Sequence, residues 1–135
     1  MEIRNLDNDI KVFYVTAESF PVGIQDAFHK LKSFLKSDDG RKFYGISHGS
    51  PDGIIYMAAV EETQEGEGKS LGCETFTIKS GSYICEDIAD WKQNVSIIGK
   101  TFQKLLKDIR VDNNGYCLEV YLNENDVSCM VKLNS

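Results

Sequence analysis

The stretch Tyr116-Cys117-Leu118-Glu119-Val120-Tyr121-Leu122 has the alternation of a β-strand and carries a carboxylate at its centre. Because successive side chains of a strand point to opposite faces, its three aliphatic residues share one face, and Glu119 lies on the other face between a thiol and a phenol. A carboxylate removed from water is costly unless a cation, a hydrogen-bond donor or a proton compensates its charge. The stretch therefore predicts a sheet strand with Glu119 in a pocket that can bind a positively charged group.

Two other stretches of the chain have the apolar spacing of helices. In residues 20–35 and 95–109, apolar side chains recur at steps of three or four, which is typical of a helix with one buried face. Turn signals end both stretches, at Asp38-Asp39-Gly40 and at residues 112–115. The remaining apolar segments read as extended strands, at residues 10–17, 43–47, 54–60, 73–78, 82–85, 116–122 and 127–133.

The order of these elements repeats along the chain. Residues 10–62 and 73–134 each read as strand, helix, strand, strand, and a polar loop at 61–72 separates them. Residues 27–32 and 101–106 also resemble each other within the two helices. We therefore predict one α+β domain over residues 1–135, an antiparallel sheet of two units related by pseudo-twofold symmetry with one long helix each, and a pocket near the symmetry axis.

Composition limits the classes of function. The 135 residues are 41% hydrophobic, which is enough for a real core, and the net charge of −6 argues against nucleic-acid binding through a broad basic face. The four cysteines are scattered, and no stretch approaches the length of a transmembrane helix. The N-terminus has no apolar signal segment. We expect a cytoplasmic protein with reduced thiols, no membrane association and no direct nucleic-acid partner.

Four segments together resemble the gyrase-inhibitor-like (GyrI-like) family, also called the bacterial transcription-activator effector-binding domain. They are Phe43-Tyr44-Gly45-Ile46, Tyr56-Met57-Ala58-Ala59-Val60, Phe76-Thr77-Ile78-Lys79-Ser80-Gly81-Ser82-Tyr83 and Cys117-Leu118-Glu119-Val120-Tyr121. The resemblance covers nearly the whole chain. It implies two strand–helix–strand–strand units around a central, aromatic-walled pocket for small, lipophilic and often cationic molecules.

The resemblance also implies which residues line that pocket. The family's glutamate falls on Glu119, and its aromatic wall positions fall on Tyr44, Tyr56 and Tyr83, with Trp91 and Tyr121 as further candidates. Trp91 has two interpretations, because it could cap the pocket as a lid or pack the start of the second helix against the core. Unlike multidrug-sensing regulators, the chain shows no helix-turn-helix before residue 10, so a direct role as a transcription factor is not expected.

The sequence leaves three functions open. The first is a stand-alone module that binds or sequesters a small lipophilic, possibly cationic molecule, with Glu119 as its polar anchor. The second is a hydrolase of strained electrophilic molecules, in which Glu119 acts as general acid or base and Tyr83 orients the substrate or water. The third is a gyrase-inhibitor-like module that binds a protein partner through an exposed patch. The residues predict no cofactor and no metal site, because His29 and His48 have no neighbours at metal-ligand spacing.

Overall fold

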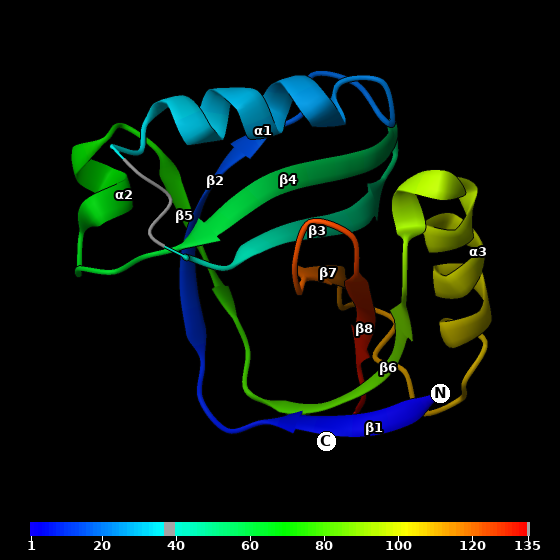
Figure 1. The fold of residues 1–135 in the computed structure, drawn as a ribbon. Coiled ribbons are helices and arrows are strands. Elements are labelled where there is room, and N and C mark those ends of the chain that lie inside the picture. The colour runs from blue at the N-terminus through cyan, green and yellow to red at the C-terminus, as the bar shows by residue number, and fades with distance from the viewer. Residues whose placement is uncertain (37–39, 135) are drawn as a thin grey trace.

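One antiparallel sheet of eight strands forms the body of the protein, in a computed structural model that describes residues 1–36 and 40–134 (Figure 1). The sheet curls into a half-barrel, and the class is α+β, as predicted. Its strands are β1 (Glu2–Leu6), β2 (Ile10–Thr16), β3 (Phe43–Ser50), β4 (Gly53–Glu61), β5 (Glu74–Ile78), β6 (Gly81–Ile88), β7 (Cys117–Tyr121) and β8 (Val127–Lys132). The helices are α1 (Ile24–Ser33), α2 (Glu67–Ser70) and α3 (Ser96–Leu105), with a 3-10 turn at Trp91–Gln93.

The order of the strands is symmetric about the centre of the sheet. It runs β1-β6-β8-β7-β3-β4-β2-β5, so that β1, β6, β8 and β7 in one half correspond to β5, β2, β4 and β3 in the other. Helix α1 connects β2 to β3, and α3 connects β6 to β7. The predicted strand–helix–strand–strand repeat is therefore present in the topology, and the antiparallel pair β3–β7 lies at its axis.

The predicted boundary of the second unit is wrong. Residues 73–78 were expected to open that unit, but β5 pairs with β2 and completes the first half of the sheet. The second unit begins instead at Gly81 in β6, and its outer neighbour is β1 at the N-terminus, a strand that the sequence analysis did not predict. The cause is that two consecutive pairs of strands each cross from one half of the sheet to the other. Strand β1 continues into β2, and β5 continues into β6. Because β1 pairs with β6 and β2 pairs with β5, these segments form a bent two-stranded ribbon that joins the halves (Figure 1).

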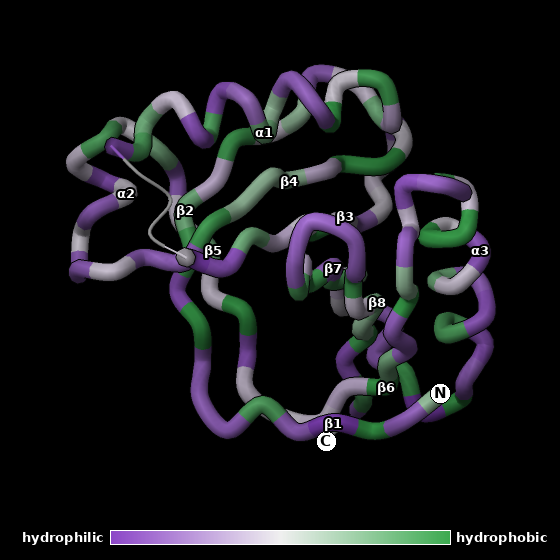
Figure 2. The backbone as a smooth tube through the Cα atoms, in the orientation of Figure 1, coloured by the Kyte–Doolittle hydropathy of each residue, from purple (hydrophilic) through white to green (hydrophobic). Residues whose placement is uncertain are grey.

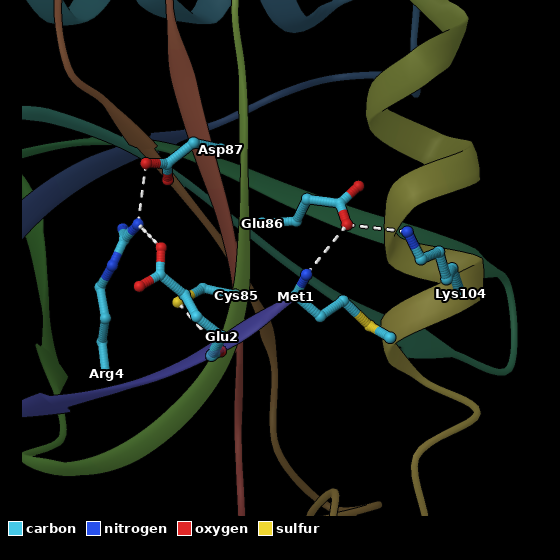
Figure 3. Close-up of polar contacts among 7 residues, drawn as sticks. All are labelled: Met1, Glu2, Arg4, Cys85, Glu86, Asp87 and Lys104. Carbon is cyan, nitrogen blue, oxygen red and sulfur yellow. Dashed lines mark hydrogen bonds and ion pairs between the residues drawn. The ribbon is translucent and has the colours of Figure 1, made fainter.

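Short polar contacts hold the bend and the outer strand in place. The Asp9 carboxylate accepts a hydrogen bond from the Ser80 amide at 2.8 Å. This bond links the two segments of the ribbon at the bend, between β1 and β2 and between β5 and β6. On β1, Arg4 contacts Glu2 and Asp87 (Figure 3). Arg4 also donates to the Ser128 hydroxyl at 3.0 Å. Ion pairs of this exposed kind contribute about 0–1 kcal/mol each, so the backbone ladder to β6 supplies most of the attachment.

The two long helices cover the outer face of the half-barrel, on either side of its centre. Helix α1 buries Ala27 and Leu31 against strands β2 and β4, and α3 buries Phe102 and Leu105 against β6 and β8 (Figure 1). Both helices are shorter than their apolar stripes, which continue into the turns beside them. Of the turn predicted at Asp38-Asp39-Gly40, the two aspartates lie outside the described residues, and Gly40 has a φ of 72°.

A separate apolar core fills the concave face of the sheet. Its fully or nearly buried members include Tyr44, Ile46, Leu118, Met130 and Tyr83. Hydrophobic residues follow the central strands, while the turn between β7 and β8 is hydrophilic (Figure 2). Within residues 1–36 and 40–134, no helix has the length and apolar character needed to cross a bilayer.

Candidate functional site

Glu119 lies on the outer face of the sheet, at the gap between the two helix-covered halves. In the register of the sheet it is flanked by Gly45 of β3 and Cys129 of β8. The next residues along these two ladders are Ala58, which packs under α1, and Glu86 of β6. The predicted face of Glu119 is therefore correct, and its position on β7 places it at the axis between the two units.

Two phenols compensate the buried carboxylate. Only 7% of Glu119 is exposed, and the Tyr56 hydroxyl donates to its Oε1 at 2.9 Å. The Tyr121 hydroxyl donates a second, short hydrogen bond to the same oxygen. Among the described residues no hydrogen bond reaches Oε2, so the two phenols satisfy only one of the two carboxylate oxygens.

The electrostatics of the cluster follow from burial. Loss of water raises the pKa of Glu119 above its ordinary value of 4.5, and the hydrogen bonds from Tyr121 and Tyr56 oppose that rise. Burial, together with the charge of Glu119, also raises the pKa of each phenol, so both hydroxyls stay protonated and act as donors. The same two causes raise the pKa of the nearby Cys117 thiol to about 11, which makes it a packing group and a poor nucleophile. The site is thus a carboxylate with an unfavourable charge that a cation could stabilise.

Gly45 is required where β3 passes the carboxylate. A Cβ atom at this position would lie 2.0 Å from the Tyr56 hydroxyl and 2.7 Å from Glu119 Oε1. Such distances are far inside van der Waals contact, so any side chain here would displace the hydrogen-bonded pair. The Tyr-Gly segment predicted to match the family contributes through its glycine, and the residue beside Glu119 is Gly45 and not Tyr44.

Aromatic rings surround the phenols. Phe28 of α1 packs edge-on against Tyr121 with the ring centroids 5.7 Å apart, and against Tyr56 at 6.3 Å. Phe20, which is 44% exposed, lies 6.1 Å from the Tyr56 ring. Sequence reasoning missed both phenylalanines, because it assigned them only to the buried stripe of the first helix. Their spacing of eight residues on that stripe was the available signal.

Trp91, from the second half of the chain, is the fifth aromatic side chain of this group. Its indole lies 5.7 Å from the Tyr121 ring, and its Nε1 is buried without a hydrogen-bond acceptor among the described residues. The turn between β7 and β8 holds this segment, because the Trp91 amide donates to the Asn125 carbonyl at 3.1 Å and the Asp90 amide donates to Asp126 Oδ1 at 3.2 Å. The contact with Tyr121 places Trp91 beside the carboxylate cluster.

The cluster is called the Glu119 site below. It consists of Glu119, Tyr56, Tyr121, Gly45, Phe20, Phe28 and Trp91.

The structure does not bring Tyr44 and Tyr83 to the Glu119 site. Both point into the concave core on the opposite face of the sheet, one residue out of phase with the strand positions that face the helices. The Tyr83 hydroxyl donates to the Lys79 carbonyl at 2.7 Å and lies 2.8 Å from the Tyr116 hydroxyl. The pair Glu119 and Tyr83, expected to act together in a hydrolase, therefore cannot converge on one atom in this arrangement.

Two of the surface hollows in the described part of the chain are open to solvent, and neither is lined by Glu119. One, of about 280 Å³, lies between α1 and the strands β2 and β5, and includes Tyr14, Lys30 and Glu74. The other, of about 470 Å³, lies at one end of the concave face beside Tyr116. None of the residues that line these two hollows belongs to the Glu119 site. No cluster of potential metal ligands occurs in the described part of the chain.

Comparison with known proteins identifies the fold. No protein-family model matches the sequence, and no curated protein matches it. An integron cassette protein from the mobile metagenome of Vibrio cholerae has a similar structure, with a TM-score of 0.67 and 16% identity over 98% of this chain and 95% of that one. A protein named SAV2435, solved with bound tetraphenylphosphonium, has a TM-score of 0.63 and 11% identity over 99% and 93% of the two chains.

Two further similar structures carry functional descriptions. One is a candidate bacterial transcription regulation protein from Staphylococcus aureus MU50, with a TM-score of 0.57 and 14% identity over 97% of each chain. The other is described as a hydrolase from Listeria innocua, with a TM-score of 0.55 and 10% identity over 98% and 90% of the two chains. At these identities the likeness is one of fold. The chain shares its architecture over nearly its full length with a protein that binds a small cationic molecule.

Proposed function

We propose that this protein binds a small lipophilic cation at the Glu119 site. The observation that carries the proposal is a carboxylate, buried in a ring of aromatic side chains, whose described donors are two neutral phenols on one of its oxygens. A bound cation would stabilise the ionised carboxylate, and its apolar body would replace contacts that the rings now make with one another. Aromatic faces add about 0.5–2 kcal/mol of attraction for a cation.

The fold supports the same class of ligand. Tetraphenylphosphonium, bound in one of the similar structures, is a cation whose charge lies inside an apolar shell. A ligand of this kind loses little hydration energy on burial and needs aromatic surface more than hydrogen bonds. The composition of the Glu119 site, with five aromatic rings around one carboxylate, fits that requirement.

The experiment compares a cation with a neutral molecule of related shape. Isothermal titration calorimetry with tetraphenylphosphonium and with triphenylphosphine oxide is carried out on the wild type and on Glu119→Gln. Because a charge-assisted contact in a desolvated site contributes about 1.5–3 kcal/mol, the affinity for the cation should fall roughly ten- to a hundredfold. Affinity for the neutral compound should change much less.

A matched control separates the local carboxylate from the overall charge. Glu124 is an exposed glutamate in the turn between β7 and β8, so Glu124→Gln changes the net charge by the same amount close to the site. That variant should bind the cation as the wild type does. Equal losses for both ligands in Glu119→Gln, or equal losses in the two variants, would contradict charge recognition by Glu119.

A hydrolase is the second candidate. A carboxyl group with a raised pKa beside phenolic donors can also act in general acid–base catalysis. On this alternative Glu119 accepts a proton from water as the water attacks a strained electrophile such as an epoxide. Tyr121 takes the role expected for Tyr83 and protonates the epoxide oxygen as its C–O bond breaks, which gives the diol. The proton that Glu119 took from water then returns to Tyr121 through the hydrogen bond between them, so both groups regain their starting states. Incubation with styrene oxide, followed by NMR, tests it: turnover that is lost in Glu119→Gln would establish the enzyme.

Regulation of transcription and binding to a protein partner are further proposals for the same fold. A regulator would couple occupancy of the Glu119 site to a partner, for which the similar transcription regulation protein is a precedent in fold only. A gyrase-inhibitor-like interaction needs an exposed surface, whereas Glu119 itself is only 7% exposed. The buried carboxylate supports the small-molecule proposal over a protein-interaction module.

A further inference from the structure

The end of the concave face contains a hollow that the Glu119 site does not use. It has a volume of about 470 Å³, within the range of small-molecule pockets, and we call it the Tyr116 hollow. Its lining consists of the rings of Phe76 and Tyr116, the imidazole of His48 with the adjoining Gly49, and the turn at residues 113–115.

The aromatic side of this hollow is fixed in place. The Phe76 and Tyr116 rings pack edge to face, with centroids 5.2 Å apart and planes at 88°. The Tyr116 hydroxyl accepts a hydrogen bond from the Lys79 amide at 3.0 Å and lies 2.8 Å from the Tyr83 hydroxyl. Because these bonds hold Tyr116 on the core side, the exposed part of its ring is a preformed surface that a ligand does not have to reorganise.

The polar side of the hollow consists of groups that can both donate and accept. Asn113 and Asn114, which have side-chain amides, are among the lining residues. His48 lines the hollow as well, and its Nδ1 lies 3.3 Å from the Gly49 carbonyl, so Nε2 is the imidazole nitrogen left for a ligand. The turn that carries the asparagines is held by its backbone, because the Asn114 amide donates to Asp112 Oδ1 and the Gly115 amide donates to the Asp112 carbonyl, both at 3.0 Å. No carboxylate, lysine or arginine is among the lining residues.

From this geometry we infer a second binding site, in the Tyr116 hollow, for an uncharged planar nitrogen heterocycle of the nucleobase class. Flat rings stack on aromatic side chains, and side-chain amides form paired hydrogen bonds with the donor and acceptor edge of such rings. The lining offers no charge partner for the lipophilic cation of the Glu119 site. The two sites lie on opposite faces of the strand pair β3–β7, so occupancy of one does not block the other.

The experiment uses adenine and uracil as probes, with glucose and tetraphenylphosphonium for comparison. Backbone amide shifts in a ¹⁵N-labelled sample, followed during titration to millimolar concentrations, locate the bound probe. A base should shift the amides of His48, Gly49 and residues 113–116 and leave Trp91 unchanged. Tetraphenylphosphonium should not produce this pattern.

Variants of the lining residues then test the assignment. Phe76→Leu removes a flat ring and Asn114→Ala removes an amide, and each should weaken base binding about tenfold or more. Gln103→Ala removes an exposed amide on α3 and serves as the matched control, with unchanged affinity. Glu119→Gln should also bind the base normally, so that failure of the cation proposal and failure of this one can be told apart.

Three outcomes would overturn the inference. They are the absence of shifts with both bases at millimolar concentration, shifts confined to residues outside the hollow, and a response to glucose that exceeds the response to the bases. Equal binding by wild type and both lining variants would likewise show that the bases do not occupy the Tyr116 hollow.

Discussion

Both faces of the central strands β3 and β7 bury polar side chains, but the hydrogen bonds that satisfy these side chains differ between the faces. On the concave face, the hydroxyls of Tyr83 and Tyr116 and the backbone of Lys79 satisfy one another, and within residues 1–36 and 40–134 no carboxyl group hydrogen-bonds to these two hydroxyls. On the outer face, two phenols converge on Glu119, and burial still raises the pKa of that carboxyl group. Among the described residues, the hydroxyls of the first arrangement bond to one another and to backbone, whereas the carboxylate of the second receives bonds only from neutral phenols. This difference is the reason for placing the cation site at Glu119.

The largest effect should come from filling the space that the carboxylate cluster needs. In Gly45→Ala the new methyl group would lie 2.0 Å from the Tyr56 hydroxyl, so the hydroxyl must move and lose its bond to Glu119. We expect a loss of about 1–3 kcal/mol in the free energy of unfolding and loss of cation binding. Urea unfolding and calorimetry measure the two effects.

Gly49 provides the matched control for that substitution. It lies on the same strand, and a Cβ atom built there would have no atom within 4 Å. Gly49→Ala should therefore leave stability within about 0.5 kcal/mol of the wild type. Similar losses in the two variants would show that alanine harms strand β3 generally, and that Gly45 has no special relation to Glu119.

A smaller effect should distinguish the phenols of the two faces. Tyr121→Phe removes one donor from Glu119, so the pKa of the carboxyl group should rise further and the affinity for tetraphenylphosphonium near neutral pH should fall about three- to tenfold. Tyr83→Phe removes a hydroxyl from the concave face and should leave the affinity unchanged. Reduced affinity in the Tyr83 variant, with none in the Tyr121 variant, would reverse the assignment of the two faces.

The smallest effect should come from the ion pairs on β1. Arg4 lowers the pKa of Asp87, chiefly through their hydrogen bond, so this pair stabilises the protein above the unfolded pKa of Asp87 and less as the pH falls through its folded value. Both side chains are substantially exposed, which limits the contribution. Arg4→Ala should cost less than about 1 kcal/mol at neutral pH in urea unfolding, with unchanged cation affinity. A loss of several kcal/mol would mean that β1 depends on Arg4 for its attachment.

The sequence predicted the repeat and the face of Glu119 because both depend on local periodicity. Alternation within residues 116–122 is enough to place Glu119 and Leu118 on different faces of the strand. Helical spacing is enough to locate α1 and α3. The pairing of β5 with β2 could not be predicted in this way, since it depends on a crossing between segments that are distant in the chain.

The tyrosines show a second limit of sequence reasoning. Tyr44 and Tyr56 are both buried aromatic residues in strands, but they point to opposite faces, and only the register of β3 with β4 and β7 determines which one reaches Glu119. Once that register is known, the alternation of β3 places Gly45 on the outer face and Tyr44 on the concave face.

The pH dependence of cation binding tests the central claim most directly. Because the pKa of Glu119 in the free protein lies above 4.5, the cation must displace a proton at lower pH, and affinity for tetraphenylphosphonium should rise by up to about tenfold per pH unit until the pH exceeds that pKa. In Glu119→Gln the affinity should be low and flat over the same range. Calorimetric titrations at a series of pH values measure both curves. A wild-type affinity that does not change with pH, or a Glu119→Gln curve with the same slope, would contradict the claim that this carboxylate recognises the charge of the ligand.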